Sequence, residues 1–338
     1  MIYVTGANGW IGLNLIKNLV KKKYHNWDLH DSQINALILE GTTKDSLMSI
    51  SPNINIVEGD VLSKSSLEIF FKNSKDAIIF HTAGIIHPKK IRDLYEINLT
   101  GTKNVLIEAA KNKAKRAVII SSNSPFGFNQ TRDTSFNEDS KYNPYMNYGN
   151  SKMLMEKAVI KLHLDLGIDV SIVRPPWFYG TFQPERQKRF YEMIRKGKFP
   201  IVGNGNNLRS MVHTDNLSQG LILAANTKIA SGKTYWIADE RSYSMNEIVG
   251  TVRELFINTY NKPCSSRNIR LPNITSYLAE YIDFLIQKTG LYNQEMHVLS
   301  EMNRNIICDI SLAKKDLFYS PKIDLKKGMK MAMDEIYF

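Results

Sequence analysis

The sequence predicts a doubly wound α/β fold, a parallel sheet with helices on both faces, joined to a second, smaller domain. Through the first half, short runs rich in β-branched residues alternate with helix-patterned stretches. These runs are apolar throughout, as strands are when helices cover both faces of a parallel sheet. A chain of 338 residues is also long for a single core. We expect the α/β domain over residues 1–175 and a substrate-binding region over residues 176–338, with some segments of the second returning to the first sheet.

The expected elements follow one another at short intervals. Strands are predicted by the runs at 1–6, 35–40, 53–60, 77–84, 116–122 and 170–176. Amphipathic helices are predicted between them, at 13–22, 66–73, 100–112 and 148–164. After residue 176 the pattern loosens into loops rich in Gly, Asn and Pro, with helices expected near 186–196, 214–226, 244–260 and 273–289. The sequence contains neither an internal repeat nor a low-complexity linker.

Composition excludes several classes of protein. Forty-four Lys and Arg against 33 Asp and Glu give a net charge of +11, which suits anionic ligands, but no interleaving of basic and aromatic residues indicates nucleic-acid binding. The two cysteines share no metal-binding or disulfide spacing, so we expect no metal and a reducing, cytoplasmic setting. There is no signal-peptide pattern and no apolar run of about 18 residues. The most apolar segment, 275–292, carries Glu280, Asp283 and Lys288 and is expected to be a half-buried helix without membrane contact.

A glycine-rich loop follows the first strand directly. In "TGANGWIG", Gly6, Gly9 and Gly12 stand between that strand and an amphipathic helix. Glycines at such a turn let the backbone approach a pyrophosphate, and the helix N-terminus offers N–H groups to the anion. The spacing differs from G-x-G-x-x-G, but the position predicts a dinucleotide site.

Two strand ends bear on the choice of dinucleotide. Glu40, at the end of the second strand, is placed to accept hydrogen bonds from the adenosine ribose and to repel a 2′-phosphate, which favours NAD. The following Thr-Thr-Lys at 42–44 would suit that phosphate and leaves NADP as the alternative. Asp60 and Val61, at the end of the third strand, are candidates to hold the adenine, although a plain turn is an equal reading.

Six motifs in order resemble the extended short-chain dehydrogenase/reductase superfamily, in its NAD-dependent epimerase/dehydratase group. They are "TGANGWIG", "HTAG" (81–84), "YEINLTGTKNVLIEA" (95–109), "SSNSPFG" (121–127), "YGNSK" (148–152) and "RPPWFYG" (174–180). The resemblance covers about 180 residues and implies a Rossmann domain, an enzyme and a nicotinamide cofactor. It assigns to the cofactor site Gly6, Asn8, Gly9, Trp10, Ile11, Gly12, Glu40, Asp60, Val61, Thr82, Ala83, Gly84, Asn98, Ser121, Tyr148, Lys152, Pro175 and Phe178.

The Tyr–Lys pair is the predicted catalytic centre. Tyr148 and Lys152 are four residues apart, so on a helix they share one face. The resemblance implies that Tyr148 is the acid/base, that Lys152 holds the cofactor ribose and lowers the tyrosine pKa, and that Ser122 orients the substrate oxygen. Asn98 is expected to tie backbone near the cofactor, and His81 to be a packed strand-end histidine.

The substrate is less closely determined. The segment 198–216 resembles the part of nucleotide-sugar enzymes that wraps the nucleotide, with Arg209 placed to meet a diphosphate. A nucleotide-sugar 4-epimerase or 4-ketoreductase is therefore favoured, with a homodimer left open. The C-terminal segment resembles that of 3β-hydroxysteroid dehydrogenase-like proteins, so reduction of an apolar ketone is the main alternative. An inactive dinucleotide-binding scaffold is the alternative from another class of protein. Asn123 and Ser124 stand where 4,6-dehydratases carry an Asp–Glu pair, which disfavours dehydration; Asn123 is instead a candidate substrate contact.

Overall fold

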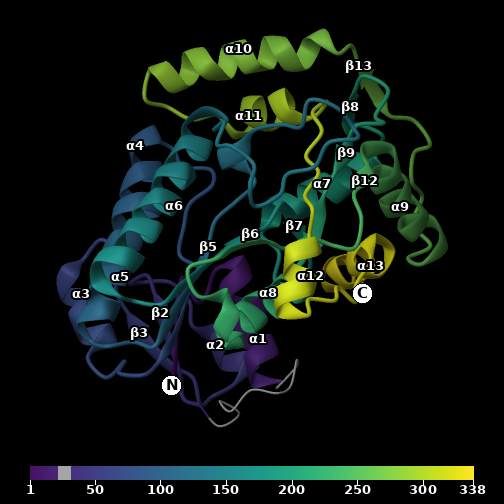
Figure 1. Cartoon of the computed structure of the whole chain (residues 1–338). Coiled ribbons are helices and arrows are strands. Elements are labelled where there is room, and N and C mark those ends of the chain that lie inside the picture. The colour runs from purple at the N-terminus through teal and green to yellow at the C-terminus, as the bar shows by residue number, and fades with distance from the viewer. Residues whose placement is uncertain (22–31) are drawn as a thin grey trace.

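A parallel sheet forms the centre of the molecule in the computed structural model, which describes residues 1–21 and 32–338. In this described part the sheet has seven strands in the order β11-β6-β5-β4-β1-β2-β3, all paired in parallel (Figure 1). The strands are β1 Ile2–Thr5, β2 Ile34–Ile38, β3 Asn55–Glu58, β4 Ile78–His81, β5 Arg116–Ile120, β6 Val170–Arg174 and β11 Thr234–Trp236. The strand order reverses beside β1, which is the doubly wound arrangement that the sequence predicted.

Helices cover both faces of this sheet. One layer contains α1 Trp10–Val20, α2 Asp45–Ile50, α8 Thr214–Asn226 and α12 Ser311–Leu317, and the other contains α3 Lys64–Phe71, α5 Thr102–Lys111 and α6 Met146–Leu166. The predicted helix 13–22 corresponds to α1, and its last residue lies outside the described part of the chain.

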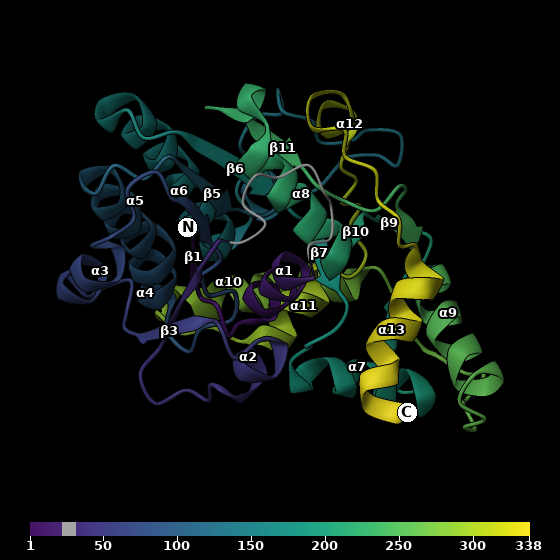
Figure 2. The same cartoon turned by 90° about the horizontal axis from the view of Figure 1, so that it is seen from below.

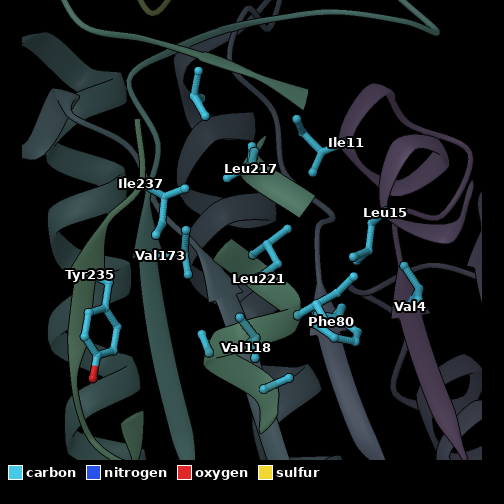
Figure 3. Close-up of a cluster of buried hydrophobic side chains, with 14 of the residues drawn as sticks. Val4, Ile11, Leu15, Phe80, Val118, Val173, Leu217, Leu221, Tyr235 and Ile237 are labelled. Atoms are coloured by element: carbon cyan, nitrogen blue, oxygen red, sulfur yellow. The ribbon is translucent and has the colours of Figure 1, made fainter. Parts of the chain in front are cut away.

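Alternation along the strands creates two separate cores. Val4 and Phe80 face the layer of α1 and α8, whereas their neighbours Tyr3 and Ile79 face the layer of α3, α5 and α6. Figure 3 shows Val4, Phe80 and Val118 beside side chains of α1 and α8. Because both faces are buried, the strands carry apolar residues at consecutive positions.

A third core lies in the second half of the chain. It is formed by β7 Trp177–Tyr179, β8 Pro200–Val202, β10 Met211–His213, α7 Glu185–Arg195, α9 Met245–Asn258 and α13 Leu325–Tyr337 (Figure 2). Short strand pairs support it: β10 with β7, β12 Tyr243–Ser244 with β9 Leu208–Arg209, and β13 Ile269–Leu271 with β8. The division at residue 175 stays a prediction, while β11, which comes after that point, is an edge strand of the first sheet.

The remaining elements lie around the sheet edge and over α6. They are α4 Ile91–Asp93, the π-helix η1 Leu94–Gly101, the 3₁₀ helices η2 Ser124–Phe126 and η3 Lys228–Ala230, α10 Ile274–Lys288 and α11 Gln294–Glu301. Helices α10 and α11 pack on each other beside the N-terminal end of α6 (Figure 1). The helices predicted after residue 176 are confirmed as α7, α8, α9 and α10. In the described residues, none of the helices has both the length and the apolar character needed to cross a membrane.

Candidate active site

The glycine loop after β1 makes close backbone contacts that exclude a side chain. Gly6 has a φ of +67°, and a Cβ built on it would come within 2.6 Å of Cα of Ala83, in the loop after β4. A Cβ on Gly12 would come within 2.3 Å of the carbonyl oxygen of Gly6. These approaches hold the first turn of α1 at the carboxyl edge of the sheet, where its N–H groups can meet an anion. The loop thus has the form that a dinucleotide pyrophosphate requires.

Glu40 and the adjacent loop lie at the carboxyl end of β2. Glu40 is exposed, and Nδ2 of Asn8 donates to Oγ1 of Thr42 at 2.9 Å, which ties the glycine loop to this segment. The Lys44 ammonium lies 2.5 Å from Oε1 of Glu58, and this hydrogen bond holds the pKa of Glu58 below its ordinary value. Glu40, exposed at this strand end, would repel a 2′-phosphate, which favours NAD over NADP.

Asp60 and Val61 form a turn after β3. Oδ1 of Asp60 accepts a hydrogen bond from the backbone N–H of Leu62 at 2.9 Å. Val61 is buried and packs beside Gly101, where an added Cβ would come 2.7 Å from Cγ2 of Val61. These contacts account for both residues as turn formers, and their part in adenine binding stays a prediction.

The loop after β4 is held by Asn98 of η1. Oδ1 of Asn98 accepts from the N–H of Ile85 at 2.9 Å, and Nδ2 donates to the Ile85 carbonyl at 3.0 Å and to Oγ of Ser151 at 3.2 Å. Thr82 donates its hydroxyl to the carbonyl of Thr5 at 2.8 Å. The expected contact of Asn98 with backbone is therefore confirmed at Ile85. Its part in the cofactor site stays a prediction.

His81 is a packing residue, as expected. Its ring nitrogens lie 2.7 Å from Oγ1 of Thr5 and 2.8 Å from Oγ1 of Thr102. Burial, with a smaller contribution from the charge of Lys152, lowers the pKa of His81 to about 3. The ring is neutral at physiological pH and links β1, β4 and the start of α5.

Ser122, Tyr148 and Lys152 meet where β5 ends against the start of α6. All three side chains are buried. Nζ of Lys152 donates to the carbonyl of Ile120 at 2.8 Å, and a Cβ built on Gly84 would lie 3.9 Å from that Nζ, so the lysine reaches across the edge of the sheet toward the loop after β4. Gly149 permits this packing, because a Cβ there would come 2.4 Å from the carbonyl oxygen of Ser124.

Burial shifts the pKa values of both titratable groups in this cluster. Burial raises the pKa of Tyr148 to about 12, and a hydrogen bond with Ser122 opposes this only in part. Burial also lowers the pKa of Lys152 to about 8, while the carboxylate of Glu156 favours its charged form. Desolvation of the phenolate dominates in the protein without cofactor, so the lowering of the tyrosine pKa by Lys152 together with a nicotinamide ring stays a prediction. A phenolate here would need further positive charge, of the kind that a bound nicotinamide ring brings.

Other predicted cofactor residues line the same edge. Ser121 is buried, and among the described residues its hydroxyl oxygen has no hydrogen-bond partner. Pro175 is buried directly after β6. Trp10 donates from Nε1 to the Thr181 carbonyl at 2.8 Å and packs edge-on against Phe178, with ring centroids 4.8 Å apart. The orphan Ser121 hydroxyl and the glycine cradle both fit a dinucleotide cofactor.

Arg209 of β9 is already paired with an acidic residue. Nη1 donates to the main-chain carbonyl of Glu301 at 3.2 Å, and Nη2 lies 3.6 Å from its Oε2. Burial lowers the pKa of Arg209, although the Glu301 carboxylate opposes this. Glu301 also lies close enough to raise the pKa of Tyr148, so Arg209 belongs to the surroundings of the catalytic cluster. Asn123, the other candidate for substrate binding, is half-buried and begins η2 beside Ser122.

A buried polar group that sequence reasoning missed joins α10 and α11 to the start of α6. Nδ1 of His297 lies 2.8 Å from Oδ2 of Asp283. Burial disfavours the charged imidazole, but the hydrogen bond to Asp283 and the nearby carboxylates together outweigh it, so the pKa of His297 is raised. The Tyr145 hydroxyl lies 2.6 Å from Oγ of Ser300. No sequence motif signals these pairs, because the partners come from separate helices.

The fold and this cluster define a class of protein. A doubly wound sheet with a glycine loop at its switch point and a Ser–Tyr–Lys cluster at the same edge is the framework of a short-chain dehydrogenase/reductase. The model of the NAD dependent epimerase/dehydratase family matches residues 2–238, so the chain belongs to that family. This membership confirms the predictions of the family, of an enzyme and of NAD as its cofactor.

Similar proteins span the whole chain. An uncharacterized protein of Sinorhizobium fredii is 41% identical over 99% of this chain and 94% of its own length. The UDP-glucose 4-epimerase of Vibrio cholerae is 25% identical (97% and 93% covered), and the decarboxylating sterol-4-alpha-carboxylate 3-dehydrogenase of Candida albicans is 24% identical (98% and 96%). Among solved structures, the UDP-glucuronic acid 4-epimerase of Bacillus cereus in complex with NAD superposes with a TM-score of 0.75 at 21% identity, covering 100% of this chain and 99% of that one. At this identity the superposition shows the fold alone.

Proposed function

We propose that this family member is a nucleotide-sugar 4-epimerase or 4-ketoreductase. The observation that carries the proposal is that Tyr148 is hydrogen-bonded to Ser122, with Lys152 one turn further along α6, at the sheet edge that also holds the glycine loop. A hydroxyl acid/base and a cation beside a dinucleotide site are the groups that interconversion of an alcohol and a ketone needs.

The cofactor residues follow from the same edge. Gly6, Gly9 and Gly12 with the first turn of α1 would hold the pyrophosphate, Glu40 the adenosine ribose, and Lys152 the ribose next to the nicotinamide. NAD, when bound, accepts a hydride from a substrate carbon and can return it. NADP stays the weaker alternative, because Glu40 would repel its 2′-phosphate.

Tyr148 and Ser122 would take part in the transfer of the substrate's hydroxyl proton. During oxidation, the Tyr148 oxygen takes the proton of the substrate hydroxyl as the hydride leaves the same carbon; during reduction it returns that proton to the carbonyl oxygen. Ser122 holds the oxygen in line through a hydrogen bond. An epimerase performs both half-reactions on opposite faces of the sugar ring, so the cofactor ends in its starting state.

Support for a nucleotide sugar comes from the residues near Tyr148 and from the relatives. The guanidinium of Arg209, whose side chain is 11% exposed, suits a diphosphate, and Glu301 pairs with it in the protein without substrate. The relatives include a UDP-glucose 4-epimerase. Asn123 and Ser124 provide no carboxyl group, which disfavours dehydration of the sugar.

A second candidate is oxidation or reduction of an apolar alcohol or ketone. An open groove of about 440 Å³ beside the start of α6 is lined by Met146, Tyr277, Glu280, Tyr281, Phe284 and Arg304. Most of this lining is apolar or aromatic, and the similarity to a sterol dehydrogenase extends over the same length as that to the epimerase.

A substrate panel separates the candidates. The purified enzyme is incubated with UDP- and dTDP-sugars, and separately with steroid and aryl ketones plus NADH or NADPH. Sugar configuration and absorbance of the reduced cofactor are both followed. Sugar interconversion without net cofactor change supports the epimerase, and cofactor consumption with only the ketones supports the second candidate. NAD binding without turnover of any member of the panel supports the inactive dinucleotide-binding scaffold, and binding of neither cofactor at millimolar concentration contradicts all three.

A further inference from the structure

Helix α10 buries mainly polar residues and exposes most of its large apolar ones. Its buried residues are Ser276, Ala279, Asp283 and Gln287. Leu278 and Tyr281, by contrast, are 58% and 60% exposed, whereas Asp283 is fully buried. We call the large exposed residues of this helix the outer face of α10; they are Ile274, Tyr277, Leu278, Tyr281, Ile282, Phe284 and Leu285. The sequence predicted a half-buried helix here, and the structure confirms it while placing Asp283 on the buried side.

Specific hydrogen bonds fix the orientation of the helix. Asp283 accepts from Nε2 of Gln287 at 2.9 Å and pairs with His297 of α11 at 2.8 Å. Oε1 of Gln287 accepts from the side chain of Asn147 on α6 at 2.9 Å. Rotating α10 to bury its apolar face would leave these buried groups without their hydrogen-bond partners, which is unfavourable. The apolar face therefore remains exposed, and Figure 1 shows α10 itself at the outside of the molecule.

The charges around the outer face are mainly positive. Lys288 ends the helix, with its ammonium 4.5 Å from the centre of the Phe284 ring. Exposed Arg267 and Arg270 come shortly before the helix. Exposed Lys89 and Lys90 lie beside the segment that follows it, where the N–H of Tyr292 donates to the carbonyl of Lys89 at 3.3 Å.

Acidic residues near this face are compensated. Asp283 is buried beneath it, and Glu280 forms a hydrogen bond with Arg304 at 2.5 Å. On α11, Glu295 lies 3.3 Å from Nη1 of Arg189. Within the described residues, the outer face is thus an apolar, tyrosine-containing strip with exposed Lys288 at the C-terminal end of the helix and exposed Arg267 and Arg270 in the segment that precedes it.

We propose that the outer face of α10 binds the surface of an anionic lipid bilayer, with the helix lying in the plane of the interface. An apolar strip flanked by Lys and Arg is the pattern of interfacial helices, and tyrosines favour the headgroup level. Basic side chains near an anionic surface add electrostatic attraction. This inference concerns binding to a membrane surface, which needs no helix that crosses it.

A second copy of the chain fits this face less well. In a two-fold antiparallel contact between two α10 helices, Lys288 of each copy would approach Arg267 and Arg270 of the other. In a parallel contact the basic ends would meet their own equivalents. Both arrangements place like charges together across an apolar contact, whereas an anionic bilayer neutralises both ends at once.

The outer face of α10 lies next to the start of the catalytic helix α6. Tyr277, Tyr281 and Phe284 line the groove that also contains Met146, two residues before Tyr148. A protein bound through α10 would therefore hold the N-terminal end of its catalytic helix close to the bilayer.

Vesicle flotation tests the proposal. The full-length protein is mixed in about 0.1 M salt with vesicles of phosphatidylcholine alone or with about 30% phosphatidylglycerol. Wild type is expected to float with the anionic vesicles only, and to be released at about 1 M salt, where the Debye length falls to about 3 Å. The double variant Leu278→Asp/Leu285→Asp is expected to lose binding by more than about tenfold.

The matched control changes equally exposed apolar residues elsewhere. Ile69→Asp/Ile229→Asp alters residues that are 70% and 52% exposed on other surfaces, and should bind as wild type does. Thermal melting and NAD binding of both variants check folding. Equal flotation of the α10 variant and wild type overturns the proposal. A change of the α10 variant from dimer to monomer in light scattering, without any vesicle binding by wild type, also overturns it and assigns the face to a second copy.

Discussion

Replacing Glu156 by glutamine is expected to destabilise the protein by about 3–5 kcal/mol, the usual cost of breaking a buried ion pair. Nε of Arg174 donates to Glu156 at 3.0 Å and Nη2 at 2.6 Å, and their side chains are 5% and 0% exposed. The guanidinium carbon lies 4.3 Å from the centre of the Phe126 ring. The variant would leave this cation without its counter-charge in an aromatic cage, where among the described residues Nη1 already has no hydrogen-bond partner.

Thermal and urea unfolding measure this cost. For 338 residues, an unfolding entropy of about 0.7 kcal/mol/K makes the expected loss of Tm about 4–7 °C. Glu247→Gln is the control, because Glu247 pairs with Arg241 at the surface and should cost no more than about 1 kcal/mol. A loss of stability in Glu156→Gln equal to that of the control would refute the reasoning. The same variant should lower the pKa of Lys152 below about 8, because Glu156 supports its charged form.

Three further variants test the surroundings of the site. The pKa of His297 is raised in the folded state. The stability that the charged imidazole contributes is therefore present below pH 6.5, its ordinary pKa, and is lost as pH rises through the folded pKa. Asp283→Asn should flatten this pH dependence of the urea midpoint, and an unchanged slope would count against the pairing. Gly12→Ala should abolish NAD binding and lower stability, because its Cβ would collide with backbone atoms. Gly250→Ala in α9 is the control: its Cβ would meet open space, so the variant should be neutral or stabilising by up to about 1 kcal/mol. Equal NAD binding and equal stability of the two variants would contradict the steric argument. Glu301→Gln should tighten UDP binding about tenfold, or roughly 1.4 kcal/mol, by releasing the guanidinium it pairs with; an unchanged Kd in calorimetry would separate that arginine from diphosphate recognition.

The sequence predicted the parts of the molecule whose determinants are local. The glycine loop, the strand ends and the pair of Tyr148 and Lys152 each occupy one strand–turn–helix unit, so spacing alone locates them. The pairing of Arg209 with Glu301 joins residues 92 positions apart, and no periodicity reports it. The pKa of Tyr148 also depends on burial by distant segments, which no local pattern reports.

Helix α10 shows the same limit more clearly. Its hydrophobic pattern predicted a half-buried helix, but not which residues that helix buries. The partners of Asp283 come from α11 and α6, so only the folded chain reveals that the polar side is the buried one. Local pattern determines that a helix forms, whereas long-range hydrogen bonds determine which face it buries.

The most direct test of the proposed function follows the hydrogen at C4 of a nucleotide sugar. The enzyme is incubated with UDP-glucose carrying deuterium at C4, and the products of wild type and Tyr148→Phe are compared by mass spectrometry and NMR. We expect wild type to invert C4 with the deuterium retained and without net NADH formation. Tyr148→Phe should keep its NAD affinity and lose turnover by about a hundredfold or more. Loss of the deuterium to solvent in the wild-type product, or a Tyr148→Phe variant that retains most of its activity, would contradict the assignment of Tyr148 as the acid/base of a hydride-transfer epimerase.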